Sequence, residues 1–119
     1  MDLIEFLQRY GDEVYAARDP EAAGRFIADP CLRHEHGHLV TMSLADNIAR
    51  IRGFLDLSPH IDVRNAAVVA GDGHVVSCYD ISIGTGPDAR TISGIEVFRV
   101  VDGLITETWN SAPQPGAWG

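Results

Sequence analysis

The stretch GIEVFRVVDGLITETWN, residues 94–110, decides the fold class of this chain. Two runs rich in valine, isoleucine and threonine flank the pair Asp102-Gly103. Residues of this kind on both sides of an Asp-Gly pair are typical of antiparallel strands joined by a tight turn. The stretch therefore predicts a β-hairpin.

The same pattern extends back along the chain as far as Pro59. Two glycine-rich segments, residues 71–73 and residues 84–87, separate further runs of valine, isoleucine and threonine, and we interpret them as turns. We therefore predict four consecutive antiparallel strands after Pro59. The tail, residues 113–119, contains two prolines and two glycines, so we expect an irregular segment that covers the fold or contacts a second copy.

Helical periodicity replaces this pattern in the first part of the chain. Apolar residues recur at three- and four-residue steps over residues 3–17, which predicts a first helix with one buried face. Asp19-Pro20 places a capping side chain before a proline at the first helical position. A short second helix is therefore expected from Pro20 to about Ala28, with Asp29-Pro30 ending it.

A third helix is predicted over residues 43–55. Ser43 and Asp46 have the spacing of a capping box, and an apolar stripe continues to Leu55. Helices followed by a meander of strands indicate an α+β fold, with helices on one face of a curved, mainly antiparallel sheet. No linker or repeat divides the sequence, so residues 1–119 are expected to form one domain.

Composition narrows the classes of partner. The chain is 45% hydrophobic and 22% charged, as expected for a globular protein, and its formal net charge is −8. This charge argues against nucleic acid and anionic membranes and favours a neutral or cationic small molecule. The sequence shows no secretory signal and no apolar run of membrane-spanning length, so we expect a cytoplasmic protein. Cys31 and Cys78 are expected to be small buried side chains in that reducing compartment.

Several stretches carry a resemblance to a known family. They are Gln8-Arg9-Tyr10, residues 25–29 (RFIAD), and residues 94–105 followed by Trp109. On these residues the chain resembles nuclear-transport-factor-2-like (NTF2-like) domains over nearly its whole length, in the branch of ketosteroid isomerases and SnoaL-type polyketide cyclases. The resemblance implies a cone-shaped fold in which three N-terminal helices and a curved sheet enclose a pocket.

The resemblance also implies site residues. In ketosteroid isomerases a first-helix tyrosine and a strand acid hold the enolate oxygen, while an aspartate after the second helix moves the proton. The matching positions are Tyr10, Glu96 and His34, and the two changes of residue type argue against steroid isomerisation itself. SnoaL-type cyclases place a histidine and an aspartate in the last two strands, where this chain has Glu96 and Asn110.

The residues themselves support a buried acid. On a strand, Glu96 shares one face with Ile92, Gly94, Phe98 and Val100, where a carboxylate is poorly solvated. We therefore expect a raised pKa and a role as general acid or oxyanion donor. The alternative is an ion pair with an arginine, such as Arg99, at the rim of the sheet.

The run HEHGH, residues 34–38, allows three interpretations. An extended conformation would place its histidines on one face. If that face lines the pocket, His34 is the base and His36 lines the mouth. If the imidazoles converge, His34, His36 and His38 form a metal site; otherwise the run is a solvated edge.

The pocket wall can be predicted from strand alternation and helix periodicity. Tyr10 lies on the apolar stripe of the first helix, so its ring is expected to be buried, as an oxyanion donor or as a core residue. By the family's spacing, Tyr79 and Ile81 line the wall on one strand. Phe98 and Asn110 are expected to contact the substrate from the next two strands.

We therefore predict an enzyme that uses no cofactor and no metal to catalyse proton transfer on a small apolar oxygenated molecule such as a polyketide. His34 would be the base, with Glu96 and Tyr10 as donors. One alternative is a non-catalytic ligand-binding or dimerisation domain, and another is a metal-dependent enzyme that uses the histidine run. The resemblance further implies a homodimer through the outer sheet face, with contributions from Arg64, Arg99 and Trp109.

Overall fold

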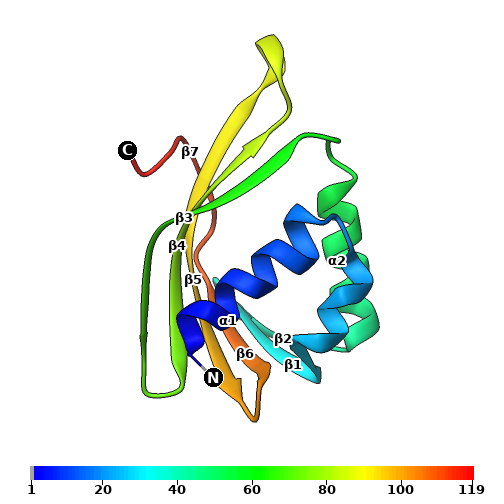
Figure 1. Ribbon diagram of the computed structural model, residues 1–119, viewed down its shortest axis with the longest axis vertical. Coiled ribbons are helices and arrows are strands. Elements are labelled where there is room, and N and C mark those ends of the chain that lie inside the picture. The colour runs from blue at the N-terminus through cyan, green and yellow to red at the C-terminus, as the bar shows by residue number, and fades with distance from the viewer. Residues whose placement is uncertain (1) are drawn as a thin grey trace.

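Helices cover one face of a strongly curved sheet, so the observed fold is the α+β arrangement expected from the sequence (Figure 1). This computed structural model describes residues 2–119. Two α-helices, α1 (Leu3–Tyr10) and α2 (Leu44–Leu55), lie on that face with a π-helical turn, η1 (Gly11–Ala16), and a 3₁₀ helix, η2 (Pro20–Arg25). A 3₁₀ turn, η3 (Gly86–Asp88), lies between two strands.

Local capping explains where the α-helices begin. The Asp2 carboxylate accepts a hydrogen bond from the Ile4 backbone N–H at 2.8 Å, and α1 continues directly into η1, so the predicted first helix is confirmed. The Ser43 hydroxyl accepts one from the Asp46 N–H at 3.0 Å, which confirms the predicted cap of α2.

The predicted second helix was too long. It ends at Arg25, and Phe26 and Ile27 are almost fully buried in the core. The Phe26 carbonyl accepts a hydrogen bond from the N–H of Ile105 at 2.7 Å, so this segment pairs with a distant strand instead of extending the helix. Asp29-Pro30, predicted to end the helix, lies within the first strand, and its peptide bond is cis.

Seven strands form one sheet. They are β1 (Ile27–Glu35), β2 (His38–Met42), β3 (Ile61–Gly71), β4 (His74–Ile83), β5 (Arg90–Val101), β6 (Leu104–Asn110) and β7 (Gln114–Pro115). The order is β2-β1-β6-β5-β4-β3, with β7 paired to β5. Only the β1–β6 pair is parallel among the strand pairs of residues 2–119. The four consecutive antiparallel strands predicted after Pro59 are β3 to β6.

The predicted hairpin turns are present. Asp72 and Gly73, and likewise Asp102 and Gly103, all have positive φ angles, from 51° to 80°. Two consecutive left-handed residues make the turn that matches the twist of the flanking strands, and Asp-Gly adopts it readily. This local chemistry fixes the register of β3 with β4 and of β5 with β6.

The C-terminal tail covers part of the outer face of the sheet, as expected, but it is not wholly irregular, because Gln114–Pro115 form β7 and pair with β5. The Trp118 N–H donates to the Asp80 carboxylate at 2.8 Å, and its indole Nε1–H donates to the Gly94 carbonyl at 3.2 Å. Of the two free cysteines, Cys31 is buried and Cys78 is half-buried. Within residues 2–119, no helix has both the length and the apolar character needed to cross a membrane.

Candidate functional site

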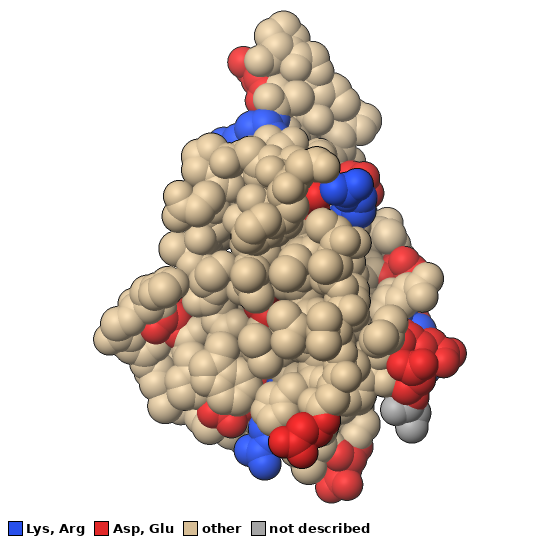
Figure 2. Space-filling view, turned by 90° about the vertical axis from the view of Figure 1, so that its left-hand side faces the viewer, with Lys and Arg blue, Asp and Glu red and all other residues tan. Residues whose placement is uncertain are grey.

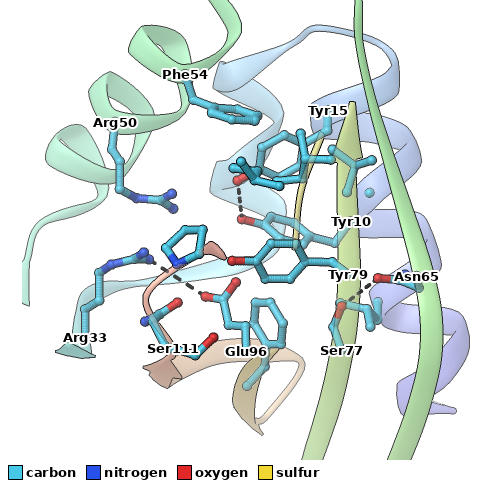
Figure 3. Close-up of a pocket in the computed structure, with 18 of the residues that line it drawn as sticks. Tyr10, Tyr15, Arg33, Arg50, Phe54, Asn65, Ser77, Tyr79, Glu96 and Ser111 are labelled. Atoms are coloured by element: carbon cyan, nitrogen blue, oxygen red, sulfur yellow. Dashed lines mark hydrogen bonds and ion pairs between the residues drawn. The ribbon is translucent and has the colours of Figure 1, made fainter. Parts of the chain in front are cut away.

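A cavity of about 530 Å³ lies between the helices and the concave face of the sheet. This volume falls in the range of pockets that hold drug-sized ligands. Its wall is partly aromatic, with Tyr10, Tyr15, Phe54, Tyr79 and Phe98, and its polar groups include Arg33, Arg50, Asn65, Ser77, Glu96 and Asn110. Figure 3 shows how these side chains converge from helices on one side and strands on the other.

Strand alternation positions most of the predicted residues. On β4, Ser77, Tyr79 and Ile81 all line the cavity, as the period of two requires. Seven of the eight predicted site residues lie there: Tyr10, His36, Tyr79, Ile81, Glu96, Phe98 and Asn110. Their positions agree with expectation, and their chemical roles stay predictions.

Glu96 lies beside an arginine at the bottom of the cavity. Its Oε2 is 3.8 Å from Nη1 of Arg33, whose Nε also donates to Glu35 at 3.1 Å. Burial raises the pKa of Glu96, and the positive charges of Arg33 and Arg50 offset part of that rise. The alternative that Glu96 pairs with an arginine is met by Arg33 and not by Arg99, which approaches Glu107 at 3.6 Å.

His34 does not line the cavity, so its expected placement as the pocket base is wrong. Its Nε2 lies 2.6 Å from Oε2 of Glu107, and its ring stacks parallel to Trp109 with 5.0 Å between centroids. Arg33, the preceding residue on β1, points into the cavity. Adjacent strand residues face opposite ways, so His34 faces the outer side of the sheet.

The three histidines of residues 34–38 also do not share one face. The chain turns at Gly37, which has φ 89°, and His38 starts β2 opposite Glu35. The extended conformation assumed for this run is interrupted by a hairpin whose second strand pairs with the first. Among residues 2–119 no group of three or more histidine, cysteine, aspartate or glutamate side chains is placed to hold a metal ion.

Two functional candidates were missed by the sequence analysis, Arg33 and Arg50. Arg33 points into the cavity because of which β1 residues face inward. That choice depends on the pairing of β1 with β6, so neighbouring residues alone do not predict it. Arg50 immediately precedes Ile51 on the apolar stripe of α2 and points into the cavity with Phe54. Its position one residue from the apolar stripe was the available signal.

Two tyrosine hydroxyls of this cavity, those of Tyr10 and Tyr79, have raised pKa values. Burial raises the pKa of Tyr10 strongly, and its hydroxyl lies 3.5 Å from that of Tyr15. Burial, followed by the charge of Glu96, raises the pKa of Tyr79. The Tyr79 hydroxyl fits against Gly94, where a Cβ atom would collide with it.

Comparison with known proteins assigns the family. The sequence profile of the SnoaL-like domain matches residues 7–108. This chain belongs to the SnoaL-like family. The sequence of this SnoaL-like domain matches none of the curated proteins.

Solved structures confirm the NTF2-like fold of this SnoaL-like domain. A proposed polyketide cyclase from Acidithiobacillus ferrooxidans is 18% identical, with a TM-score of 0.77 over 89% of this chain and 84% of that one. IdmH, a proposed polyketide cyclase from Streptomyces antibioticus, is 13% identical, with a TM-score of 0.78 over 96% and 93%. An epoxide hydrolase of the LEH-like type from M. tuberculosis is 16% identical, with a TM-score of 0.72 over 91% and 76%. At these identities the likeness is one of fold.

Proposed function

We propose that this SnoaL-like domain is an enzyme that moves a proton on a small, largely apolar, oxygenated metabolite, in an isomerisation, dehydration or cyclisation. One observation carries the proposal: the carboxyl group of Glu96 lies in a partly aromatic cavity beside Arg33 and Tyr79. The similarity to proposed polyketide cyclases supports a polyketide-like substrate.

The arrangement supports a mechanism with one proton-transfer group. The ionised Glu96 carboxylate removes a proton from the carbon beside a substrate carbonyl, and the C–H electrons move into an enolate whose charge lies on oxygen. The Arg33 guanidinium and the neutral Tyr79 hydroxyl donate toward that oxygen. Glu96 then returns the proton to a different atom, which completes an isomerisation or follows a ring closure.

A raised pKa suits Glu96 to both steps. A proton acceptor works best when its pKa approaches the pH at which it operates. At that pKa the group is still partly ionised, is as basic as possible, and can also give the proton back. The aromatic wall lowers the solvation of the carboxylate and so raises its basicity. Glu96 therefore takes over the base role first expected of His34, and Tyr10 lies behind as a buried neutral donor.

Hydrogen exchange provides the test. Wild-type protein is incubated in D₂O with a panel of cyclic ketones and enones, and deuterium incorporation beside the carbonyl is followed by NMR. Glu96→Gln is expected to slow exchange by about 100-fold or more while ligand binding is kept. Glu107→Gln, which alters a glutamate on the outer sheet face, is the matched control and should keep the rate. Equal exchange by wild type and Glu96→Gln would overturn the proposal.

The second candidate is a ligand-binding domain without catalysis. The size and aromatic wall of the cavity favour it independently of Glu96. Such a domain binds members of the panel equally well with and without the Glu96 carboxylate and produces no exchange. The same experiment therefore separates the two candidates.

We also propose that the domain forms a homodimer through the outer face of the sheet. That face is largely uncharged, with charged side chains mainly at its margin (Figure 2). Leu39, on the edge strand β2, and Val69, on the opposite edge strand β3, are 52% and 65% exposed on it. A largely uncharged face with exposed apolar side chains is typical of a protein interface. Val69→Glu is expected to shift the species seen by analytical ultracentrifugation from dimer to monomer, and a monomeric wild type would contradict the proposal.

A further inference from the structure

Arg50 is a cation with a buried guanidinium that forms no salt bridge with any carboxylate of residues 2–119, although its charge acts on Glu96 across the cavity. It projects from α2 toward the centre of the cavity, facing the tyrosine hydroxyls (Figure 3). Its Nε and Nη2 both lie 3.3 Å from one acceptor, Oδ1 of Asn47. Across residues 2–119 no carboxylate forms a salt bridge with it, whereas Arg33 contacts two and Arg52, on the same helix, contacts Glu21 at 2.8 Å.

This arrangement leaves hydrogen-bonding capacity unused. A guanidinium has five N–H donors in a rigid plane; Asn47 accepts from at most two of them, at long distance, and the Tyr15 side chain accounts for one further hydrogen bond. Removing a cation from water is costly unless it gains an anion or strong hydrogen bonds. The planar fork of an arginine matches the two oxygens of a carboxylate, which is the anion that it binds best in this geometry.

The surroundings of Arg50 indicate what accompanies that anion. Phe54 and the rings of Tyr10 and Tyr15 form the adjoining wall, and these two rings pack edge to face with 5.6 Å between centroids. An apolar or aromatic body fits against this wall, while the Tyr15 hydroxyl faces the same space as the guanidinium. A phosphate dianion fits less well, because among residues 2–119 only one guanidinium that lines the cavity lacks a salt bridge, and Glu35 and Glu96 line the same cavity.

We propose that Arg50 binds a carboxylate of the substrate, so that the substrate class of this domain is an apolar or aromatic carboxylic acid. The statement that this acid is the substrate rests on the proposed function. The statement that the cavity binds a carboxylate does not depend on it. The net charge of −8 suggested a neutral or cationic ligand, but the charges are unevenly placed. Inside the cavity, the charge of Arg33 is shared between Glu35 and Glu96. Arg50 has no such contact, and a carboxylate of the ligand would form its ion pair.

Matched acids and amides provide the test. Binding of 2-naphthoate and 2-naphthamide to the full chain is measured by NMR, together with acetate and acetamide, which are too small to be rejected by shape. The Nε–Hε signals of the arginines serve as reporters. We expect each acid to bind about tenfold or more tightly than its amide, as for hydrogen bonds to charged groups, and to shift the Arg50 signal but not that of Arg52.

Variants make the result specific. Arg50→Gln should remove the preference for the acid, Arg50→Lys should keep part of it, and Arg52→Gln should leave it intact; circular dichroism checks that each variant is folded. Glu96→Gln should keep the preference, because Arg50 is unchanged, so a failure of the catalytic proposal would not be mistaken for a failure of this one. Equal binding of acids and amides by wild type, or a preference that survives in Arg50→Gln, would overturn the inference.

Discussion

The guanidinium of Arg33 lies 3.8 Å from the carboxylate of Glu96, inside a cavity whose wall is partly aromatic. The pair is long, and Arg33 also donates to Glu35 at 3.1 Å, so its charge is divided between two carboxylates. Burial therefore outweighs ionic attraction, and the pKa of Glu96 is raised. The proposed chemistry depends on this balance.

The first prediction concerns stability and the Glu96 carboxyl group. Its pKa is higher in the folded state than in the unfolded state, so between the two values the folded protein binds more protons and the free energy of unfolding falls as pH rises. Glu96→Gln should lack that fall. Urea unfolding of both proteins from pH 4 to pH 8 measures it, with Glu21→Gln, whose side chain is 69% exposed, as control. A wild-type stability that rises with pH relative to Glu96→Gln would contradict the prediction.

The second prediction has the opposite sign and concerns Asp80. Hydrogen bonds from Arg64 and from the Trp118 N–H hold the pKa of Asp80 below its usual value. The stabilisation is present above the unfolded-state pKa and is lost as pH falls through the folded-state pKa. Asp80→Asn should therefore be less stable than wild type at pH 7, with the difference shrinking in acid. Asp62→Asn, on exposed β3 surface, is the control, and an unchanged difference at low pH would refute the assignment.

The third prediction uses two glycines. A Cβ atom on Gly94 would collide with the Tyr79 hydroxyl, whereas a Cβ atom on Gly53, in α2, meets nothing within 4 Å. Gly94→Ala should lower the free energy of unfolding by about 1–3 kcal/mol through overpacking and displace Tyr79. Gly53→Ala should raise it by about 0.5–1 kcal/mol through helix propensity. Chemical denaturation measures both, and a neutral Gly94→Ala would show that Tyr79 is not held against the strand.

The fourth prediction separates His34 from the site. Its ring stacks on Trp109 on the outer face, so His34→Gln should leave naphthoate binding and hydrogen exchange unchanged. Loss of the aromatic pair should lower the free energy of unfolding by about 0.5–1.5 kcal/mol. Binding, exchange and denaturation are measured on one preparation. If exchange is lost while binding is kept, His34 is the base after all.

Local patterns predicted much of this structure. The Asp-Gly turns and the period-two alternation along β4 and β5 depend on neighbouring residues, so Tyr79, Ile81 and Phe98 could be assigned to the cavity wall from the sequence. One proline was misinterpreted: Pro30 was expected to end a helix and instead lies within β1. There the burial of Phe26 outweighed local helix propensity.

The rest depended on contacts between distant segments. The parallel pairing of β1 with β6 determines which β1 residues face the cavity. As a result Arg33 faces the cavity, and His34, which was expected there, faces the outer side. The hairpin at Gly37 requires β2 as a partner, so the histidine run could not be assigned from its own spacing. Arg50 faces the cavity because of how α2 packs on the sheet. Helix periodicity alone does not predict whether a residue beside the apolar stripe faces the cavity or the solvent.

The most direct test of the account is a carbon-13 NMR titration of the Glu96 carboxyl group in wild type, Arg33→Gln, Arg50→Gln and Arg52→Gln. Burial should place its pKa above that of an exposed glutamate, about 4.3. Removing the charge of Arg33 or Arg50 should raise the pKa further, and Arg52→Gln should leave it unchanged. A pKa at or below that of exposed glutamate, insensitive to Arg33 and Arg50, would contradict the proposed proton-transfer site.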